Sequence, residues 1–322
     1  MTYINCPLYG LKSKKQLKRL LRINDNRLLK QSYIVSLVSP YIDKSGKPRL
    51  IEPPQDELKR IQKRIKNYLG LITVPDNIFS GIKGRSYADN AKSHAGNKPR
   101  NLYKIDLTAF FPSITRNTVY RFFIEDLSCS PDVAQLLTNL TTIDLIKSNA
   151  KNLHEICEFL SKKNVTSYNH LISGAPTSQI LSYLVNHRMF DEMQKTADDN
   201  GITMTVYVDD VTFSSENRIS KDFRDTIIAI IKKYNYQISH KKVKRYTKLY
   251  PKLITGVIID ASGKTVIKNS IRKKIIFTYN EFKKNPDNED LRMRLRGLLI
   301  AARQIDPSAF PSIYKFAFHS NK

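Results

Sequence analysis

Residues 203–213 read TMTVYVDDVTF, and they are the most informative segment of the chain for predicting its structure. Two runs of β-branched and apolar residues, 203–208 and 211–213, flank a doubly acidic tip. Such runs on either side of a short polar tip predict a β-hairpin, here with the carboxylates of Asp209 and Asp210 at its turn. An Asp-Asp turn is usually only a solvated tip, so the pair indicates a site only if further acidic groups join it.

A further acidic residue, Asp106, ends another predicted strand. Residues 102–107 form a short, mostly apolar run followed by aromatic residues, which is typical of a buried strand. A small sheet would bring Asp106 beside Asp209 and Asp210. Carboxylates on stiff backbone bind hard divalent ions, and two such ions about 4 Å apart serve phosphoryl transfer onto a 3′-hydroxyl. We therefore predict these three residues as metal ligands, with the Leu107 backbone carbonyl as an additional candidate.

Composition indicates a polyanionic partner. The 322 residues carry 54 Lys/Arg and 29 Asp/Glu, a net charge of +25, and residues 221–322 alone contribute +15. Nucleic acid explains this excess best, and an anionic membrane is the alternative. No apolar run approaches the roughly 18 residues that span a bilayer, and residues 1–10 lack the pattern of a signal peptide. We expect a cytoplasmic protein without a membrane partner, with Cys6, Cys129 and Cys157 as reduced thiols.

Periodicity and turn residues predict the remaining elements. We expect basic amphipathic helices in 11–39, a hairpin with a basic tip over 41–51, a helix over 56–69, a mainly helical middle to about His170, a helix over 223–234, strands near 237–239 and 253–259, and a helical stretch over the last 55 or so residues. The hydrophobic content of 41 % allows one large unit or a few packed subdomains.

The acidic motifs resemble those of reverse transcriptases, and they occur in the family's order. Tyr207-Val208-Asp209-Asp210 matches the Tyr-x-Asp-Asp box, and residues 105–114, IDLTAFFPSI, look like the first palm motif. Between them, residues 174–178, GAPTS, resemble the glycine motif, although Ser173 and Gln179 stand where the family often has Gln and Pro. The resemblance implies that the incoming nucleotide and template contact Gly174, Ala175, Gln179 and Tyr207.

Three further matches imply roles in nucleotide addition. Residues 44–54 resemble the fingers hairpin, whose Lys47 and Arg49 would clamp the triphosphate and offset charge in the transition state. Phe111 falls where the family has an aromatic steric gate against the ribose 2′-hydroxyl. Residues 238–243 resemble a later palm motif in which a lysine protonates pyrophosphate, so Lys242 is the candidate, with Lys241 beside it. Each role has an alternative. The hairpin tip would then be a solvated basic turn, Phe111 an ordinary core residue, and Lys241 and Lys242 solvated lysines.

Two short signatures resemble the retron branch of the family. Asn90 and His94 fit its Asn-Ala-x-x-His pattern, and Ile254-Thr255-Gly256 corresponds to its Val-Thr-Gly triplet. The resemblance implies RNA binding by Asn90, His94, Thr255 and Gly256, joined by the basic helix residues Lys273 and Lys274. His94 is equally consistent with a hydrogen-bonded structural histidine. From the length we expect no RNase H, integrase or endonuclease domain.

The resemblance implies an α+β fold shaped as a right hand: fingers over 1–100, an antiparallel-sheet palm over 101–255 with a helical insertion at about 126–170, and a helical, basic thumb over 256–322. The enzyme would be an RNA-directed DNA polymerase that uses dNTPs and two Mg²⁺ ions, with Mn²⁺ as a substitute. It would copy a dedicated structured non-coding RNA into a branched RNA–DNA product (msDNA) in anti-phage defence, with a separate effector protein.

Two alternatives remain open at this point. The first is another bacterial reverse transcriptase, of the abortive-infection or diversity-generating type. The second is a non-catalytic RNA-binding protein on a polymerase scaffold, against which the intact set of three carboxylates argues.

Overall fold

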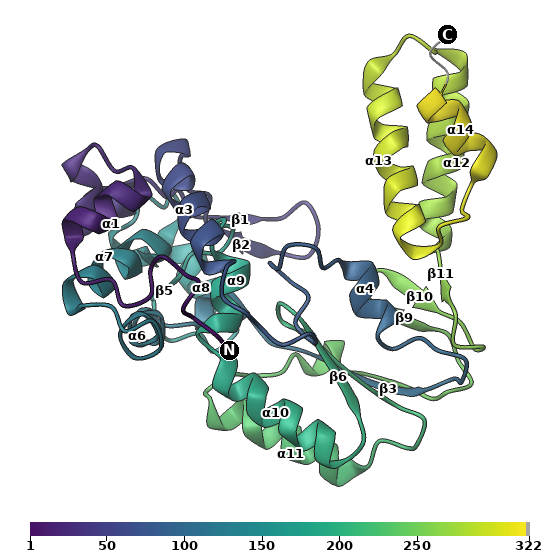
Figure 1. The fold of residues 1–322 in the computed structure, drawn as a ribbon, viewed down its shortest axis with the longest axis horizontal. Coiled ribbons are helices and arrows are strands. Elements are labelled where there is room, and N and C mark those ends of the chain that lie inside the picture. The colour runs from purple at the N-terminus through teal and green to yellow at the C-terminus, as the bar shows by residue number, and fades with distance from the viewer. Residues whose placement is uncertain (320–322) are drawn as a thin grey trace.

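A four-stranded antiparallel sheet lies at the centre of the molecule (Figure 1), which a computed structural model describes over residues 1–319. The strand order is β6-β7-β3-β8. The bounds are β3 Asn101–Asp106, β6 Thr203–Tyr207, β7 Asp210–Ser215 and β8 Lys244–Tyr246. Helices α10 (His187–Asp199) and α11 (Lys221–Lys233) pack below this sheet, where Phe223 of α11 meets Phe213 of β7 edge to face.

The predicted hairpin and strand are both confirmed. β6 and β7 pair directly, and only Val208 and Asp209 connect them. Val208 adopts a φ of 60°, a left-handed conformation that costs a β-branched residue roughly 1–2 kcal/mol. β3 pairs with β7 in a register that places Asp106 opposite Asp210. The tight turn and this register therefore fix the three acidic residues relative to one another.

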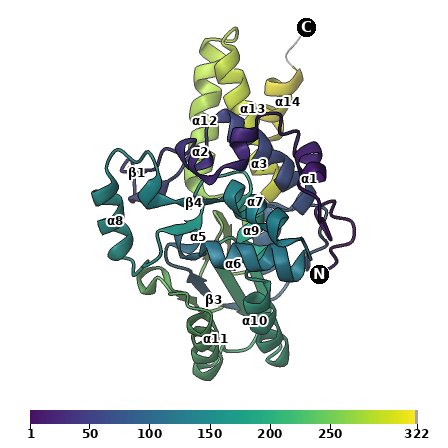
Figure 2. The same cartoon turned by 90° about the vertical axis from the view of Figure 1, so that its left-hand side faces the viewer.

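The N-terminal half forms the fingers side of the molecule (Figure 2). Predictions for helices in 11–39, a hairpin over 41–51 and a helix over 56–69 are confirmed. The elements are α1 Lys14–Leu21, α2 Gln31–Ser36, β1 Tyr41–Asp43, β2 Arg49–Ile51 and α3 Asp56–Leu69. Apolar residues of α3 at helical spacing, among them Leu58, Ile65 and Leu69, are fully buried in the main core, which this half shares with the central sheet.

The predicted helical middle also contains two short strands. Its elements are α5 Phe110–Ser113, α6 Arg116–Arg121, α7 Pro131–Thr141, β4 Thr142–Asp144, α8 Leu153–Ser161, β5 Asn169–Leu171 and α9 Ser178–Leu184. β4 and β5 pair antiparallel, and the backbone N–H of Leu171 donates to the Ile114 carbonyl. The segment after α5 is thereby tied to the segment that precedes the glycine motif.

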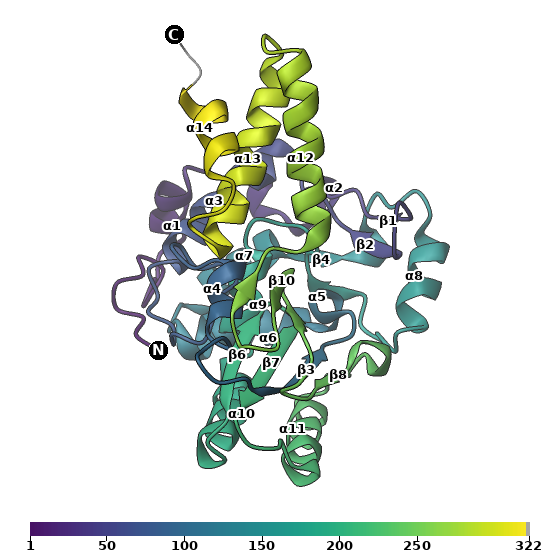
Figure 3. The same cartoon turned by 90° about the vertical axis from the view of Figure 1, so that its right-hand side faces the viewer.

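The C-terminal elements form a helical body with its own core (Figure 3). They are β9 Lys252–Ile254, β10 Val257–Ile259, β11 Thr265–Val266, α12 Asn269–Lys284, α13 Glu289–Ile305 and α14 Pro311–His319. Ile275 and Phe282 of α12 share this core with Leu295 and Leu299 of α13, and the predicted helical stretch over the last 55 or so residues is confirmed. The three helices stand away from the central sheet (Figure 1). The exact subdomain limits at 100 and 255 stay predictions.

One predicted strand is wrong. Residues 237–239 form only an isolated bridge, between Ile238 and Leu107, because a short 3₁₀ turn over 240–242 ends the pairing. Beyond this turn, β8 pairs with β3 along the same edge of the sheet. Among residues 1–319, none of the helices combines the length and the apolar character that crossing a bilayer requires.

His94 anchors the short helix α4 (Tyr87–Lys92) to the central sheet. Its ring nitrogens lie 2.7 Å from the hydroxyls of Ser214 and Thr205, on β7 and β6. Only 2 % of the residue is exposed, and burial lowers its pKa to about 3. The ring therefore presents no nitrogen to RNA, and any part of His94 in RNA binding must act through the position of α4.

The buried ring predicts acid sensitivity. The pKa of His94 is lower in the folded chain than in the unfolded chain, so the folded chain binds fewer protons. The free energy of unfolding therefore falls as the pH drops below the unfolded pKa of 6.5. We expect a loss of roughly 2 kcal/mol in unfolding free energy between pH 6.5 and about pH 5. Urea denaturation at several pH values measures this loss. His94→Gln does not titrate and should show a flatter profile; equal slopes for the two proteins would contradict the assignment.

Candidate active site

Three carboxylates meet at the end of the central sheet. Asp106 is the last residue of β3 and lies opposite Asp210, the first residue of β7. Asp209 precedes Asp210 in the turn, and its carbonyl accepts a hydrogen bond of 2.9 Å from the N–H of Leu107. The structure thus brings together the three predicted acidic residues from segments about a hundred positions apart in the chain.

Two lysines compensate the charge of this cluster. The ammonium of Lys242 donates to both carboxylate oxygens of Asp106, at 2.6 and 2.8 Å. The ammonium of Lys104 lies 2.5 Å from Oδ2 of Asp210, and both side chains are less than one-fifth exposed. Lys242 was a predicted site residue, and Lys104 was missed. The period of two along β3 gave a signal, because it places Lys104 on the same face as Asp106.

Burial makes the acidic cluster poorly compatible with three negative charges. Burial and the nearby charge of Asp106 raise the pKa of Asp209 to about 6. Burial also raises the pKa of Asp210, although Lys104 opposes that shift. Desolvated carboxylates next to one another are stabilised by cations, so the site favours a bound positive charge.

The donor set suits divalent metal ions. Oδ1 of Asp210 is buried and has no hydrogen-bond partner within residues 1–319, and carboxylate oxygens are the hard ligands that Mg²⁺ prefers. In this structure two of the three carboxylates are paired with lysines, so the acidic side chains lie near one another without forming a ready-made metal-ligand group, and the described part of the chain contains no such group elsewhere. Asp106, Asp209 and Asp210 are thus the residues that would hold metal, and Lys104 and Lys242 stabilise the carboxylates without it.

The predicted nucleotide-binding residues lie on several elements. Lys47 and Arg49 are exposed on the β1–β2 hairpin, and Phe111 lies half-buried on α5. Gly174 has a φ of 105°, which residues with a side chain rarely adopt, and its loop leads to buried Ala175 and to Gln179 near the start of α9.

A hollow of about 460 Å³ adjoins the carboxylates. Asp209, Asp210 and Tyr207 line it, together with Tyr87, Val208 and Thr255. Tyr207 and Thr255 were both predicted site residues, and the hollow places them on one surface. It also connects the acidic turn with the β9–β10 turn of the C-terminal body.

The residues expected to bind RNA fall into two groups. Asn90 is buried and its amide donates to the Thr255 hydroxyl at 3.3 Å, while Gly256 is exposed in the β9–β10 turn. Lys273 and Lys274 are exposed on α12. Exposed residues of this set are available to phosphate, whereas Asn90 shapes the turn from beneath.

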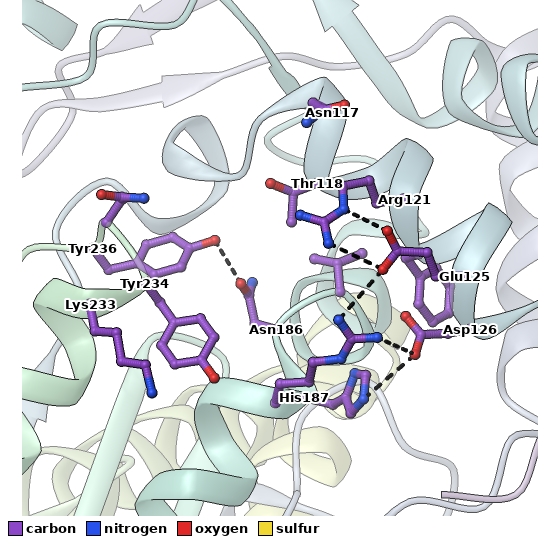
Figure 4. A pocket seen from close by; sticks show the side chains of 14 residues that line it. Asn117, Thr118, Arg121, Glu125, Asp126, Asn186, His187, Lys233, Tyr234 and Tyr236 are labelled. Atoms are coloured by element: carbon purple, nitrogen blue, oxygen red, sulfur yellow. Dashed lines mark hydrogen bonds and ion pairs between the residues drawn. The ribbon is translucent and has the colours of Figure 1, made fainter.

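A separate pocket of about 230 Å³ contains none of the predicted site residues (Figure 4). Its charged side chains neutralise one another: Arg121 pairs with Glu125, and Arg188 contacts both Glu125 and Asp126. The polar groups are already satisfied within the protein, so the pocket offers little to an ionic ligand.

An antiparallel palm with three carboxylates at its edge, set between a fingers side and a helical body, defines a template-directed nucleic-acid polymerase. Comparison with known families agrees with that class: residues 41–278 match the family of reverse transcriptases (RNA-dependent DNA polymerases). The chain belongs to the reverse transcriptase family and is an RNA-directed DNA polymerase. The predicted α+β right-hand fold is confirmed, and divalent metal ions are the general cofactors of this family.

The chain is similar to bacterial relatives over most of its length. It is 24 % identical over 273 residues to the retron Ec83 reverse transcriptase of Escherichia coli, which covers 83 % of this chain and 82 % of that protein. It is 26 % identical over 266 residues to the retron Mx65 reverse transcriptase of Myxococcus xanthus, covering 82 % of this chain and 60 % of the relative. The predicted resemblance to retron reverse transcriptases is confirmed.

Among solved structures, the chain is similar to apo telomerase from Candida tropicalis truncated from its C-terminal domain. The match has a TM-score of 0.43 and 14 % identity, and it covers 73 % of this chain and 55 % of the telomerase chain.

The position of Phe111 predicts control over the sugar of the incoming nucleotide. A smaller side chain would leave room for a 2′-hydroxyl, so Phe111→Val should raise the efficiency of rNTP relative to dNTP incorporation about tenfold or more. Single-nucleotide extension with each substrate measures the ratio. Phe316→Val, the same change at a half-buried aromatic of α14, is the control. An unchanged ratio in Phe111→Val would remove this residue from the gate.

Proposed function

We propose that this polymerase is of the retron type. It copies a dedicated structured non-coding RNA into DNA, starts from the 2′-hydroxyl of an internal guanosine and leaves a branched RNA–DNA product, msDNA. Its cellular role is anti-phage defence together with a separate effector protein. Another bacterial defence or diversity-generating reverse transcriptase is the alternative.

One contact carries this proposal. Asn90 and Thr255 belong to the two retron-like signatures, lie 165 positions apart and are hydrogen-bonded at 3.3 Å. The Thr255 hydroxyl donates in turn to the Tyr87 carbonyl of α4 at 2.8 Å. The two signatures therefore form one structural unit beside the acidic turn. A structural unit at this place is suited to binding an RNA whose priming nucleotide must reach the active site.

The basic C-terminal body supports an RNA partner. Lys273 and Lys274 are exposed on α12, in a region that contributes +15 of the net charge of +25. Duplex RNA hides its base edges in a deep groove, so a protein recognises it mainly through shape and phosphate contacts. We assign these lysines to phosphates of the bound RNA.

The side chains around the cluster account for nucleotide addition. A 3′-oxygen, or the priming 2′-oxygen, attacks the α-phosphorus of a dNTP and releases pyrophosphate. Lys47 and Arg49 bind the triphosphate and offset its growing charge, and Phe111 excludes a 2′-hydroxyl from the incoming sugar. Lys242, now paired with Asp106, donates a proton to the leaving pyrophosphate.

Asp106, Asp209 and Asp210 would hold two Mg²⁺ ions, for which Mn²⁺ can substitute. Bound ions would stabilise the charge on the attacking and leaving oxygens. Lys104 opposes the upward shift that burial causes in the pKa of Asp210, and its ammonium holds Oδ2 in place before the metal binds.

Asp209→Asn tests the acidic site. The change removes a negative ligand at a turn without changing side-chain size, so primer extension should fall at least about a hundredfold while RNA affinity and folding are retained. Extension of an annealed primer on RNA, with Mg²⁺, measures the loss. Asp222→Asn, at an exposed position in the first turn of α11, is the matched control. Substantial extension by Asp209→Asn would disprove the site assignment.

The nucleic acid that copurifies from the native host tests the retron assignment. We expect one dominant small RNA joined to DNA through an internal 2′-oxygen. Ribonuclease should leave a short residual RNA at the DNA 5′ end, and a debranching enzyme should release it. Free linear DNA, or a mixed RNA pool without attached DNA, would favour the alternative type while leaving the polymerase activity in place.

A further inference from the structure

A buried polar cluster joins the fingers hairpin to the glycine loop. It consists of Glu52, the first residue after β2, His170 of β5 and Ser173, which precedes Gly174. Glu52 and His170 are both 0 % exposed. Glu52 lies within the stretch 44–54 that resembles the fingers hairpin but has no predicted role there, and His170 belongs to none of the motifs described above.

Glu52 and Ser173 are held together through both backbone and side chain. The N–H of Glu52 donates to the Ser173 carbonyl at 2.7 Å, and the N–H of Ser173 donates to Oε2 of Glu52 at 2.6 Å. The Ser173 hydroxyl donates to the Leu50 carbonyl at 3.0 Å. The end of β2 and the start of the glycine loop are thus fixed at hydrogen-bonding distance.

His170 extends this connection to α5. Its Nε2 lies 2.9 Å from Oε1 of Glu52, and since an ionised carboxylate only accepts, Nε2–H is the donor. Nδ1 of His170 is buried and has no partner among the residues described. β5 is bonded to Ile114, directly after the helix that carries Phe111. Glu52 therefore connects three segments that surround the nucleotide site.

Stability alone does not explain an acidic group at this place. A buried polar pair is often no more stabilising than apolar side chains of the same volume, because both groups lose their hydration. A carboxylate differs from an apolar group because its hydrogen bonds are directional and hold the donors at a set distance and angle. The cluster is thus better suited to holding segments in position than to adding stability.

We propose that Glu52 is a positioning residue for the incoming nucleotide. It holds the hairpin with Lys47 and Arg49 at a fixed separation from the Gly174–Ala175 loop, so that the triphosphate clamp and the opposite wall of the site keep one geometry. The inference rests on the nucleotide-binding roles proposed above for these residues. Gly174 lies close to the same hairpin: a Cβ built on it would be 3.9 Å from Ile51.

Glu52→Ala tests the proposal in single-turnover extension by one nucleotide, with dNTP concentration varied. We expect the apparent Kd for dNTP to rise about tenfold or more, while the maximal rate stays within about threefold and the affinity for primer–template is unchanged. Glu52→Gln should restore most of the dNTP affinity, because its amide accepts from Ser173 and can donate to the other tautomer of His170.

Gln62→Ala is the matched structural control. Gln62 is also 0 % exposed, and its amide donates to the Leu140 carbonyl at 2.9 Å, which joins α3 to α7 rather than to the hairpin. The Gln62→Ala variant should lower the free energy of unfolding, as Glu52→Ala does, but leave the affinity for dNTP unchanged. An equal loss of dNTP affinity in both variants would mean general loosening and overturn the proposal, as would unchanged affinity in Glu52→Ala.

Arg49→Ala separates this inference from the proposed nucleotide site. If Arg49→Ala leaves dNTP affinity unchanged, the triphosphate clamp is wrong; if it weakens binding and Glu52→Ala does not, only the positioning role fails. Should Glu52→Ala not fold, Ser173→Ala removes the single bond to Leu50. That variant should raise the apparent Kd for dNTP about threefold at an unchanged maximal rate, and no change would overturn the inference.

Discussion

The antiparallel pairing of β3 with β7 assembles the active site. It places Asp106 opposite Asp210, and the short turn before β7 adds Asp209 at the same edge. Several other elements pack on this sheet or are hydrogen-bonded near the site at its end. α10 and α11 cover the sheet, α4 is bonded to it through His94, and the fingers hairpin is connected to the site through Glu52.

Side-by-side carboxylates in a partly dehydrated site create an electrostatic problem, and the protein solves it with lysines. Lys104 contacts Asp210 and Lys242 contacts Asp106. One lysine precedes the three acidic residues in the sequence and the other follows them. This arrangement offsets the charge of two of the carboxylates, whereas Asp209, whose pKa burial raises to about 6, has no lysine partner at contact distance within residues 1–319. The strand register thus places the carboxylates, and the lysines separately offset their charge.

The sequence predicts those features that depend on local pattern. The acidic hairpin, the strand ending at Asp106, and the helices over 56–69 and near 223–234 follow from periodicity and turn residues, and the motif order adds the right-hand fold. Features that depend on long-range packing could not be predicted. Residues 237–239 and β8 lie one after the other along the same sheet edge, interrupted by a 3₁₀ turn, and the contact between Glu52 and His170 joins positions 118 apart.

The register of the central sheet also limits how the chain can vary in length. Successive side chains of a strand point to opposite faces, so one residue inserted into β3 or β7 would turn every following side chain to the wrong face. Such a change would separate Lys104 from Asp210 and move Asp106 out of the cluster. Insertions and deletions among natural variants of this chain should therefore accumulate in the loops outside these two strands. There they change the length of a loop without changing the register that places the acidic residues and Lys104 together.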